Sequence, residues 1–533
     1  MKRITAAFLC ALVLATSGLM PARARQVSRP PLWGELSPGP YAVGFSAVYA
    51  FDRSRTWRVT RAYEKGFSPD PDGRPIRVSV WYPATISPGA KRMRYEDYIT
   101  LPAPKEFADL ESAIERRDRT IAGLSVPPER LQELLATPVN AYRDAPPAAG
   151  RFPLILHFGG LSDAATLNLF VMAEFLASHG YVVATVPLLG PTNEQTPQSL
   201  SPADIDTTVR DMEFAWSLLR GRSDVDNVKL GVTGHSLGGV EALIFAMRNA
   251  NVSAAVGLDG TYGFAGSSAR LLTDSFDYAP QKLRGALLDL RRPDGDQGST
   301  LDLSAVHSFR YADRTFITVH KMHHSDFTSF ATVAQEFHLG SPGWVERFGW
   351  TRETGYRGYQ LVCEMVRDFF DEKLKGESGG ARRLAADVAR ADGGAMSVEP
   401  GMPAPPSPKE FADLIARHGF DSAVAVVERY RGSVPVETVV GESAFNSLGY
   451  SLIGEKRFAE AVGVLRLVTY VYPRSANAED SLGDAYLAAG EKEKARAAFQ
   501  KALELVAADP RFDAEGKKSF ARDEQSKIEQ LKP

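Results

Sequence analysis

Between about residue 40 and residue 375, short apolar runs alternate with longer amphipathic segments. This rhythm is typical of strands joined by crossover helices in a mostly parallel β-sheet. FPLILHFGG (152–160) predicts a buried strand that ends in glycines, and YVVATVPLLG (181–190) predicts another. Amphipathic helices are expected at 166–180, ending at Gly180, and at 203–221. The sequence therefore predicts an α/β fold, with helices on both faces of a mostly parallel sheet.

Two segments before residue 152 are not part of this rhythm. PIRVSVWYPA (75–84) alternates as an antiparallel edge strand does. Residues 92–147 follow it, with charged helical stretches such as KEFADLESAIERRDRTIAGL, and are predicted to be a helical insertion. Two interpretations of this insertion stay open: a lid over a functional site, or a solvated helical decoration.

The first 24 residues have the composition of a secretory signal peptide. Lys2 and Arg3 precede an apolar run that is too short to span a membrane, and Ala22-Arg23-Ala24 is a small-x-small cleavage site. Phe8-Leu9 precedes Cys10, where a lipoprotein signal needs small residues, so a lipid anchor is not expected. We expect cleavage after Ala24 and a secreted or periplasmic protein without a transmembrane segment.

Charge and cysteine content exclude several functional classes. The chain has a net charge of −3, and loss of Lys2, Arg3 and Arg23 with the signal peptide lowers it to −6. No polybasic block favours nucleic acid, so no nucleic-acid partner is expected. Cys363 is the only cysteine after cleavage, which excludes an intrachain disulfide and a cysteine-based metal site.

The C-terminal part of the chain predicts a second, helical domain. Residues 376–408 are predicted to be a linker because the Gly- and Pro-rich stretch 393–408 lacks apolar periodicity. Within 409–533, similar segments recur at an offset of 34 residues, from Leu448-Gly449 to Leu482-Gly483. This pattern resembles a pair of tetratricopeptide repeats, at about 442–475 and 476–510, and 409–430 is expected to add a helical hairpin or cap. A docking surface for a protein partner and a helical appendage are both open interpretations.

The segment GVTGHSLGG (231–239) contains a G-x-S-x-G pentapeptide centred on Ser236. A β-prone run (Val228 to Thr233) precedes it and a helix-forming run (Gly239 to Asn249) follows it. Glycines on both sides of the serine allow a sharp strand-to-helix turn, and the helix N-terminus can stabilise an oxyanion. This context predicts that Ser236 is a nucleophile.

A serine nucleophile needs a base and an orienting carboxylate, in the chain order Ser, acid, His. Asp259 follows the apolar strand VSAAVGL, at the carboxyl end of the sheet where catalytic groups gather. Asp294 and Asp296 follow the next strand and are alternatives, whereas Asp289 falls inside that strand and is expected to be structural.

Three histidines lie close together in RTFITVHKMHHSDF. His320 alternates within the predicted strand and is expected to be packed. His323 and His324 should lie on the loop after the strand, which is expected to end near Met322, so either can be the general base. A metal site is disfavoured because no partner at helical spacing accompanies the histidines.

These residues resemble the α/β-hydrolase superfamily, and more narrowly the plasma-type platelet-activating-factor acetylhydrolases and dienelactone-hydrolase-like esterases. The resemblance covers roughly residues 40–375, through RPIRVSVWYPA, FPLILHFGGLSD, FLASHGYVVATVP, VTGHSLGG, AAVGLDG and ITVHKMHHSDF. It implies that Asp259 is the acid. The family places Asp or Asn and then Phe shortly after its base, which fits Asp326-Phe327 and implies His324 rather than His323 as the base.

The resemblance also implies an oxyanion hole made of the backbone N–H groups of Leu161 and Leu237. The His-Gly pair that the family has before the first of these donors is replaced here by Gly159-Gly160. The implied mechanism is ester hydrolysis through an acyl-enzyme on Ser236, with no metal or organic cofactor. The implied substrate is a small, short-acyl or phospholipid-like ester.

Two other functional classes remain open. An acyltransferase or peptidase can use the same three residues on the same fold. A catalytically silent hydrolase fold can instead act as a binding module through the C-terminal repeats.

Overall fold

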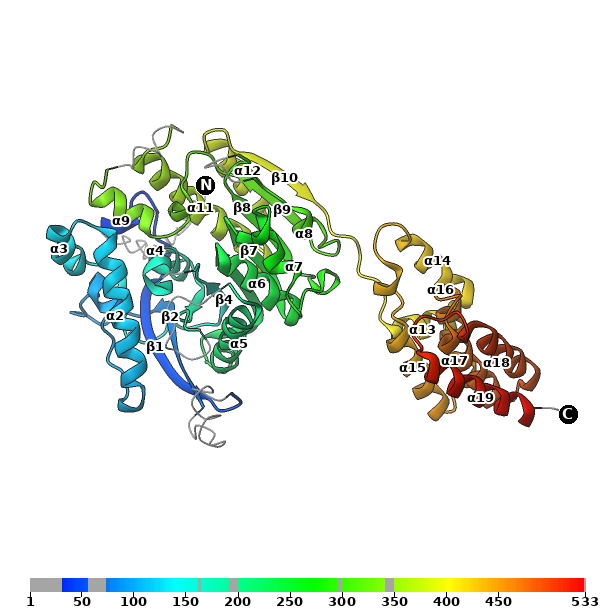
Figure 1. Cartoon of the computed structure of the whole chain (residues 1–533). Helices are drawn as coiled ribbons and strands as arrows, with labels where there is room; N and C mark the ends of the chain where they lie inside the picture. The colour runs from blue at the N-terminus through cyan, green and yellow to red at the C-terminus, as the bar shows by residue number, and fades with distance from the viewer. Residues whose placement is uncertain are drawn as a thin grey trace, which may run out of the picture.

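The computed structural model describes residues 31–55, 73–161, 164–190, 200–295, 300–340 and 349–531, and the fold is given for these residues. The predicted signal peptide, 1–24, lies outside them. Figure 1 shows a sheet surrounded by helices, followed by an extended connection and a group of C-terminal helices. No helix among the described residues is long and apolar enough to cross a membrane.

One sheet organises the described part of residues 31–399. It has ten strands in the order β10-β9-β8-β7-β6-β4-β5-β2-β1-β3. Six adjacent strands, β9-β8-β7-β6-β4-β5, are parallel to one another. Strand β2 is antiparallel to both β1 and β5, and β10 is antiparallel to β9. The predicted mostly parallel α/β sheet is therefore confirmed. The strands are β1 (Ala42–Asp52), β2 (Arg74–Ala84), β3 (Ala141–Arg143), β4 (Phe152–Phe158), β5 (Val182–Thr185), β6 (Val225–His235), β7 (Val252–Leu258), β8 (Ala286–Arg291), β9 (Arg314–Thr318) and β10 (Ala395–Glu399).

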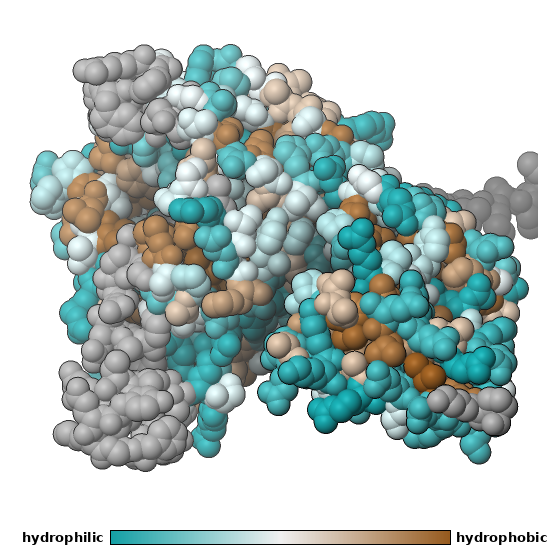
Figure 2. All heavy atoms as spheres, turned by 45° about the vertical axis from the view of Figure 1, so that its right-hand side comes forward, coloured by the Kyte–Doolittle hydropathy of each residue, from teal (hydrophilic) through white to brown (hydrophobic). Residues whose placement is uncertain are grey.

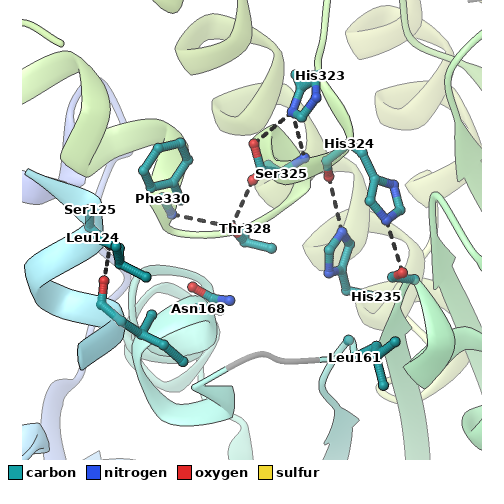
Figure 3. Close-up of a pocket in the computed structure, with 13 residues that line it drawn as sticks. Leu124, Ser125, Leu161, Asn168, His235, His323, His324, Ser325, Thr328 and Phe330 are labelled. Atoms are coloured by element: carbon teal, nitrogen blue, oxygen red, sulfur yellow. Dashed lines mark hydrogen bonds between the residues drawn. The ribbon is translucent and has the colours of Figure 1, made fainter. Parts of the chain in front are cut away.

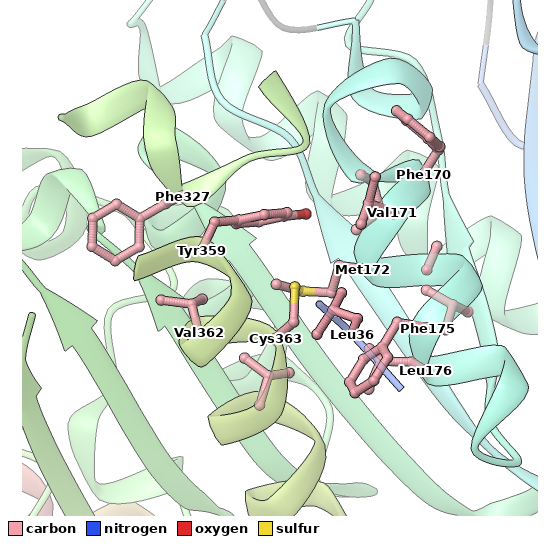
Figure 4. Packing of buried hydrophobic residues seen from close by; sticks show 14 of the residues in the cluster. Leu36, Phe170, Val171, Met172, Phe175, Leu176, Phe327, Tyr359, Val362 and Cys363 are labelled. Atoms are coloured by element: carbon pink, nitrogen blue, oxygen red, sulfur yellow. The ribbon is translucent and has the colours of Figure 1, made fainter. Parts of the chain in front are cut away.

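Helices cover both faces of the sheet and create two hydrophobic cores. Alternate residues of one strand point to opposite faces, so Ile155 packs in one core while Leu154 and Leu156 pack in the other. Helices α4 (Ala165–Ser178) and α11 (Arg352–Lys373) cover the first face, and Figure 4 shows their side chains meeting over the sheet. Helices α5 (Pro202–Leu219) and α6 (Leu237–Arg248) cover the second face. Shorter elements follow β7 to β9: η5 (Thr261–Gly263), α7 (Ser267–Thr273), η6 (Pro280–Lys282), α8 (Ser304–His307), η8 (His324–Phe327) and α9 (Phe330–Glu336).

The expectation that 75–84 forms an edge strand is wrong. Strand β2 lies between β1 and β5, and all of its residues are buried. Its alternation in the sequence has a different cause: the polar positions are buried and hydrogen-bonded. Arg77, for example, is 1% exposed and pairs with Glu111 at 2.9 Å.

The predicted insertion, 92–147, is partly built into the main core. Its elements are η2 (Tyr95–Tyr98), η3 (Lys105–Phe107), α2 (Ala108–Ser125), η4 (Pro128–Arg130), α3 (Leu131–Ala136) and strand β3 of the sheet. Tyr95 and Tyr98 lie in the same core as α4. The buried Arg77–Glu111 ion pair joins β2 to α2, and the Tyr49 hydroxyl donates to Glu111 at 3.0 Å. Helix α2 is therefore held firmly against the sheet.

Glu174 of α4 connects this insertion to the segment before β1. Its carboxylate accepts hydrogen bonds from Trp33 Nε1 at 2.6 Å and from the Tyr98 hydroxyl at 2.7 Å. The backbone N–H groups of Asn140 and Ala141 donate to the same carboxylate, at 3.0 and 3.1 Å. Complete burial raises the pKa of Glu174 to about 7 although these four donors oppose the shift.

Replacing Glu174 with glutamine is expected to lower the free energy of unfolding by about 1–3 kcal/mol, because an amide group offers only one acceptor oxygen to these donors. Urea denaturation at neutral pH measures the change. Glu115→Gln, on the exposed face of α2, is the matched control and should cost little, since exposed ion pairs contribute little. Equal effects of both substitutions would contradict the account of Glu174.

The predicted linker 376–408 is wrong over most of its length. Helix α12 (Gly380–Arg390) packs on α11, and β10 adds an antiparallel strand to the edge of the sheet beside β9. Apolar periodicity could not reveal β10, because its side chains are largely exposed and backbone pairing holds it in place. Only residues 400–407 remain as an extended connection.

The C-terminal helices are α13 (Pro408–His418), α14 (Phe420–Tyr430), α15 (Glu442–Gly454), α16 (Phe458–Val471), α17 (Ala476–Ala488), α18 (Lys492–Val506) and α19 (Ala514–Gln530), with η9 (Val436–Thr438) after α14. The pairs α15–α16 and α17–α18 each form a contacting hairpin, and their glycines show the repeat. A Cβ on Gly449 would lie 2.6 Å from Leu465, and a Cβ on Gly483 would lie 2.3 Å from Phe499. The identification as tetratricopeptide repeats stays a prediction.

Figure 2 shows apolar patches among hydrophilic side chains on one face of the molecule.

Candidate active site

Ser236 lies in the turn between strand β6 and helix α6. Its backbone has φ 55° and ψ −122°, a conformation that non-glycine residues rarely adopt. The Ser236 N–H donates to the Leu258 carbonyl at 3.1 Å, and its own carbonyl accepts from Gly239 and Thr261. These hydrogen bonds fix the turn and place the serine at the N-terminus of α6.

The two glycines of the pentapeptide are required by close backbone contacts. A Cβ on Gly234 would lie 2.0 Å from the Gly238 carbonyl oxygen. A Cβ on Gly238 would lie 2.1 Å from the carbonyl oxygen of Phe158, at the end of β4. The spacing G-x-S-x-G is therefore a packing requirement of this turn.

The structure brings Ser236, His324 and Asp259 together. His324 Nε2 lies 2.8 Å from Ser236 Oγ, and His324 Nδ1 lies 2.6 Å from Asp259 Oδ2. With the imidazole neutral, Nδ1–H donates to the carboxylate and Nε2 accepts the serine hydroxyl proton. The three residues come from the ends of β6 and β7 and from η8 after β9, at the carboxyl edge of the parallel strands, where open α/β sheets bind ligands.

The ionisation states suit a base and its orienting acid. Burial would raise the pKa of Asp259, but hydrogen bonds and charges from His324 and Arg292 outweigh it and lower the value to about 2. Burial lowers the pKa of His324, aided by His235 and Arg292, against the opposite pull of Asp259. At neutral pH the carboxylate is therefore ionised and the imidazole is neutral.

We expect the acid limb of kcat/KM for a neutral ester to lie below the ordinary histidine pKa of about 6.5. The base works only when neutral, so activity is full above the lowered pKa of His324 and falls as pH falls through it. A pH–rate profile with an uncharged substrate measures this limb. A limb above pH 7 would contradict the assignment.

The alternative acids lie elsewhere. Asp294 accepts a hydrogen bond from the Leu301 backbone at 2.9 Å in an exposed loop, and Asp296 lies outside the described residues. Asp289 is buried, accepts from the Tyr262 hydroxyl at 2.6 Å and pairs with Arg291, as expected of a structural residue.

His324 is the histidine of this segment that hydrogen-bonds to Ser236. Strand β9 ends at Thr318, so the expected end near Met322 and the placement of His320 inside the strand are wrong. The chain leaves the strand early, and Lys321 adopts φ 60°. His323 caps η8 by accepting from the Ser325 N–H, and burial lowers its pKa to about 4. Among the described residues no group of three or more His, Cys, Asp or Glu side chains could hold a metal ion.

The loop after β4 packs directly on the turn at Ser236. The carbonyl oxygens of Phe158 and Gly159 face Gly238, which leaves no space for a side chain. Leu161 follows in this loop and Leu237 is the first residue of α6, so both predicted oxyanion donors lie in segments beside Ser236. Their role stays a prediction.

Ser236 lines a pocket of about 440 Å³, which Figure 3 shows from close by. Helix α2 contributes its C-terminal end, including Leu124, which is 82% exposed and so forms part of the rim. The side chain of Asn168, near the start of α4, points into the space in Figure 3. The insertion therefore reaches the site. The described lining residues are Ile121, Leu124, Ser125, Gly160, Leu161, Asn168, His235, Ser236, His323, His324, Ser325, Thr328 and Phe330.

Two neighbours of the site were missed in the sequence. His235 Nε2 donates to the backbone oxygen of His324 at 3.0 Å, with the two rings 4.8 Å apart. Arg292 Nε donates to Asp259 Oδ2 at 2.7 Å. A signal for Arg292 existed: it follows β8 directly, at the same sheet edge as Asp259.

The sheet order, the nucleophile turn after β6 and the site at the carboxyl edge define the α/β-hydrolase fold. A family match over part of the chain supports an enzyme of this fold, a carboxylic-ester hydrolase. Residues 126–285 match the model of the chlorophyllase family, a stretch that contains Ser236 and Asp259 and ends before His324. No curated protein matches the chain. A ferulic acid esterase from Streptomyces cinnamoneus is similar in structure, with 20% sequence identity and a TM-score of 0.46 over 64% of this chain and 93% of that one.

Proposed function

We propose that this chain is a serine esterase that cleaves short acyl esters through Ser236, His324 and Asp259. The observation that carries the proposal is the continuous set of contacts from Ser236 Oγ through His324 to the buried Asp259, with Ser236 and His324 lining a pocket. The distance of 2.8 Å between His324 Nε2 and Ser236 Oγ is short enough for proton transfer. The distance of 2.6 Å between His324 Nδ1 and Asp259 Oδ2 is short enough to fix the imidazole tautomer.

In this mechanism Ser236 Oγ attacks the ester carbonyl while His324 Nε2 takes the hydroxyl proton. The tetrahedral oxyanion is stabilised by the backbone N–H groups of Leu161 and Leu237 and by the N-terminal end of α6. His324 then gives the proton to the leaving alcohol. Water hydrolyses the acyl-enzyme by the same steps in reverse, and Asp259 stabilises the imidazolium throughout.

The pocket favours uncharged substrates of modest size. None of the described lining residues is Lys, Arg, Asp or Glu, and Ile121, Leu124, Leu161 and Phe330 supply apolar surface. A charged acyl group would lose its hydration there without an opposite charge to pair with. Asn168 offers an amide for one hydrogen bond to the substrate.

Finer aspects of the proposal rest on sequence resemblance. The likeness to platelet-activating-factor acetylhydrolases suggests a short acyl chain on a phospholipid-like ester as one substrate class. Export follows from the signal-peptide pattern of residues 1–24. The C-terminal helices, if they are tetratricopeptide repeats, give a surface for a protein partner.

The test is hydrolysis of p-nitrophenyl esters from acetate to octanoate, with a 2-acetyl phospholipid, an acyl-accepting alcohol and a peptide amide in parallel. We expect the highest kcat/KM for the shortest neutral esters and a decline with chain length as the pocket of about 440 Å³ fills. Preferred transfer to the alcohol or cleavage of the amide would favour an acyltransferase or a peptidase. Failure to turn over any ester would refute the proposal and favour a silent fold that binds a partner.

A further inference from the structure

Asp259, the proposed orienting acid, is shared between two cationic or potentially cationic partners. Its Oδ2 atom accepts from His324 Nδ1 at 2.6 Å and from Arg292 Nε at 2.7 Å. Its Oδ1 atom accepts from the backbone N–H of Arg292 at 3.2 Å. The carboxylate is 1% exposed and Arg292 is 5% exposed, so water screens this arrangement weakly.

The sheet topology places Arg292 at this position. Strands β7 and β8 are adjacent and parallel, with Leu258 opposite Leu290, so the residues just beyond their ends meet. The Asp259 N–H donates to the Leu290 carbonyl at 2.7 Å and fixes the two strand ends together. The Arg292 guanidinium also lies over the Phe264 ring, 5.5 Å from its centroid, and Phe264 contacts the His324 ring edge-on at 5.8 Å.

We propose that Arg292 is a positioning residue of the hydrolase site, which holds the Asp259 carboxylate against His324 and sets the lower end of the pH range in which the site works. This inference rests on the proposed function. The guanidinium Nε of Arg292 binds one carboxylate oxygen of Asp259 and its backbone N–H binds the other, which fixes the side-chain torsions of Asp259 and keeps the carboxylate ionised. Its positive charge also opposes protonation of the neighbouring imidazole.

The charges around His324 are few and come from separate elements. Asp259 at the end of β7 favours the imidazolium, whereas Arg292 after β8 and His235 at the end of β6 disfavour it. His323 precedes His324 in the same loop, and its own environment includes Arg352 at the start of α11. Asp326 follows in η8, where burial raises its pKa to about 6 and its carboxylate accepts from the His323 N–H at 2.7 Å. Arg292 is thus the one permanent cation that both binds Asp259 and acts on His324 among the described residues.

The experiment compares full-length wild type, Arg292→Gln, Arg292→Lys and Arg222→Gln in pH profiles of kcat and KM for p-nitrophenyl acetate. Arg222 is the control because its guanidinium also binds a buried aspartate, Asp224, through Nε and Nη2 at 2.9 and 2.8 Å, but before β6, at the opposite edge of the sheet. We expect Arg292→Gln to move the acid limb up by about one pH unit and to lower kcat about 10- to 100-fold with a small change in KM. Arg292→Lys keeps the charge and should restore the limb to within a few tenths of a unit, and it serves as the folded variant if Arg292→Gln does not fold.

If Arg292 only stabilises the fold, the pH profiles and stabilities of the variants will differ from these expectations. Arg292→Gln and Arg222→Gln would then lose thermal stability alike, with the acid limb unchanged in both, and the inference would be wrong. A direct NMR titration of the His324 imidazole, assigned with His324→Gln, separates this inference from the proposed function. If wild type hydrolyses no ester, the proposed function fails, while a rise in the titration midpoint in Arg292→Gln still supports the positioning role and an unchanged midpoint still refutes it.

Discussion

Replacing Ser236 with alanine is expected to reduce kcat for short neutral esters by about 10⁴-fold or more. The hydroxyl is the atom that His324 Nε2 contacts at 2.8 Å, and without it no acyl-enzyme can form. The fold should persist, since alanine removes one oxygen and the turn is fixed by backbone hydrogen bonds that alanine keeps. Steady-state kinetics with p-nitrophenyl acetate measure the loss.

Ser217→Ala is the matched control for this substitution. Ser217 lies on the exposed side of α5, where its hydroxyl donates to the Phe214 carbonyl of the same helix. Its removal should leave kcat within a factor of two. Residual activity in Ser236→Ala comparable to the control would place the nucleophile elsewhere.

The second large effect is expected for Asp259→Asn, with a loss in kcat of about 10⁴-fold. An asparagine amide can turn its NH₂ group toward His324 Nδ1 and favour the tautomer that carries the proton on Nε2, which cannot accept the serine proton. Binding of substrate should change little, because Asp259 lies behind the imidazole and does not line the pocket. The same kinetic assay, resolved into kcat and KM, tests both statements.

Asp294→Asn tests whether the assignment of the acid is correct. Asp294 was open as the acid on sequence grounds, but its carboxylate accepts from the Leu301 backbone in an exposed loop. Its substitution should leave kcat nearly unchanged. A large loss with Asp294→Asn and a small one with Asp259→Asn would reverse the assignment.

The sequence predicted the parts of the fold that depend on burial periodicity. Strands β4 and β6 have apolar runs that fit burial on both faces of the sheet, and helices α4 to α6 have apolar positions that fit packing against it; all of them are found near their expected ranges. The pattern could not predict β10, whose side chains are largely exposed and which pairs with β9 through its backbone, with Glu399 also paired to Arg314. It also misplaced β2, because buried polar side chains such as Arg77 imitate an exposed face.

The candidate site was predictable where local geometry requires particular residues. The glycines around Ser236 are needed for backbone contacts as short as 2.0 Å, and such requirements leave a sequence motif. The resemblance to a known family then implied Asp259 and His324. Arg292 and His235 act through contacts between segments that are distant in the sequence. The position of Arg292 directly after β8 was a signal for its place at this sheet edge, but no local pattern shows which residues meet there. The sequence also left open whether the insertion covers the site. An amphipathic pattern identifies the apolar face of a helix, but it does not show which part of the protein that face packs against.

The most direct test of the central claim is covalent labelling of the full chain with a fluorophosphonate, followed by peptide mass spectrometry. An activated serine attacks phosphorus and retains the phosphonyl group, so the label reports the nucleophile without any assumption about the substrate. The account predicts one adduct, on the peptide that contains Ser236, and its loss in His324→Gln. Absence of an adduct from wild type, or an adduct on another serine that persists in Ser236→Ala, would contradict it.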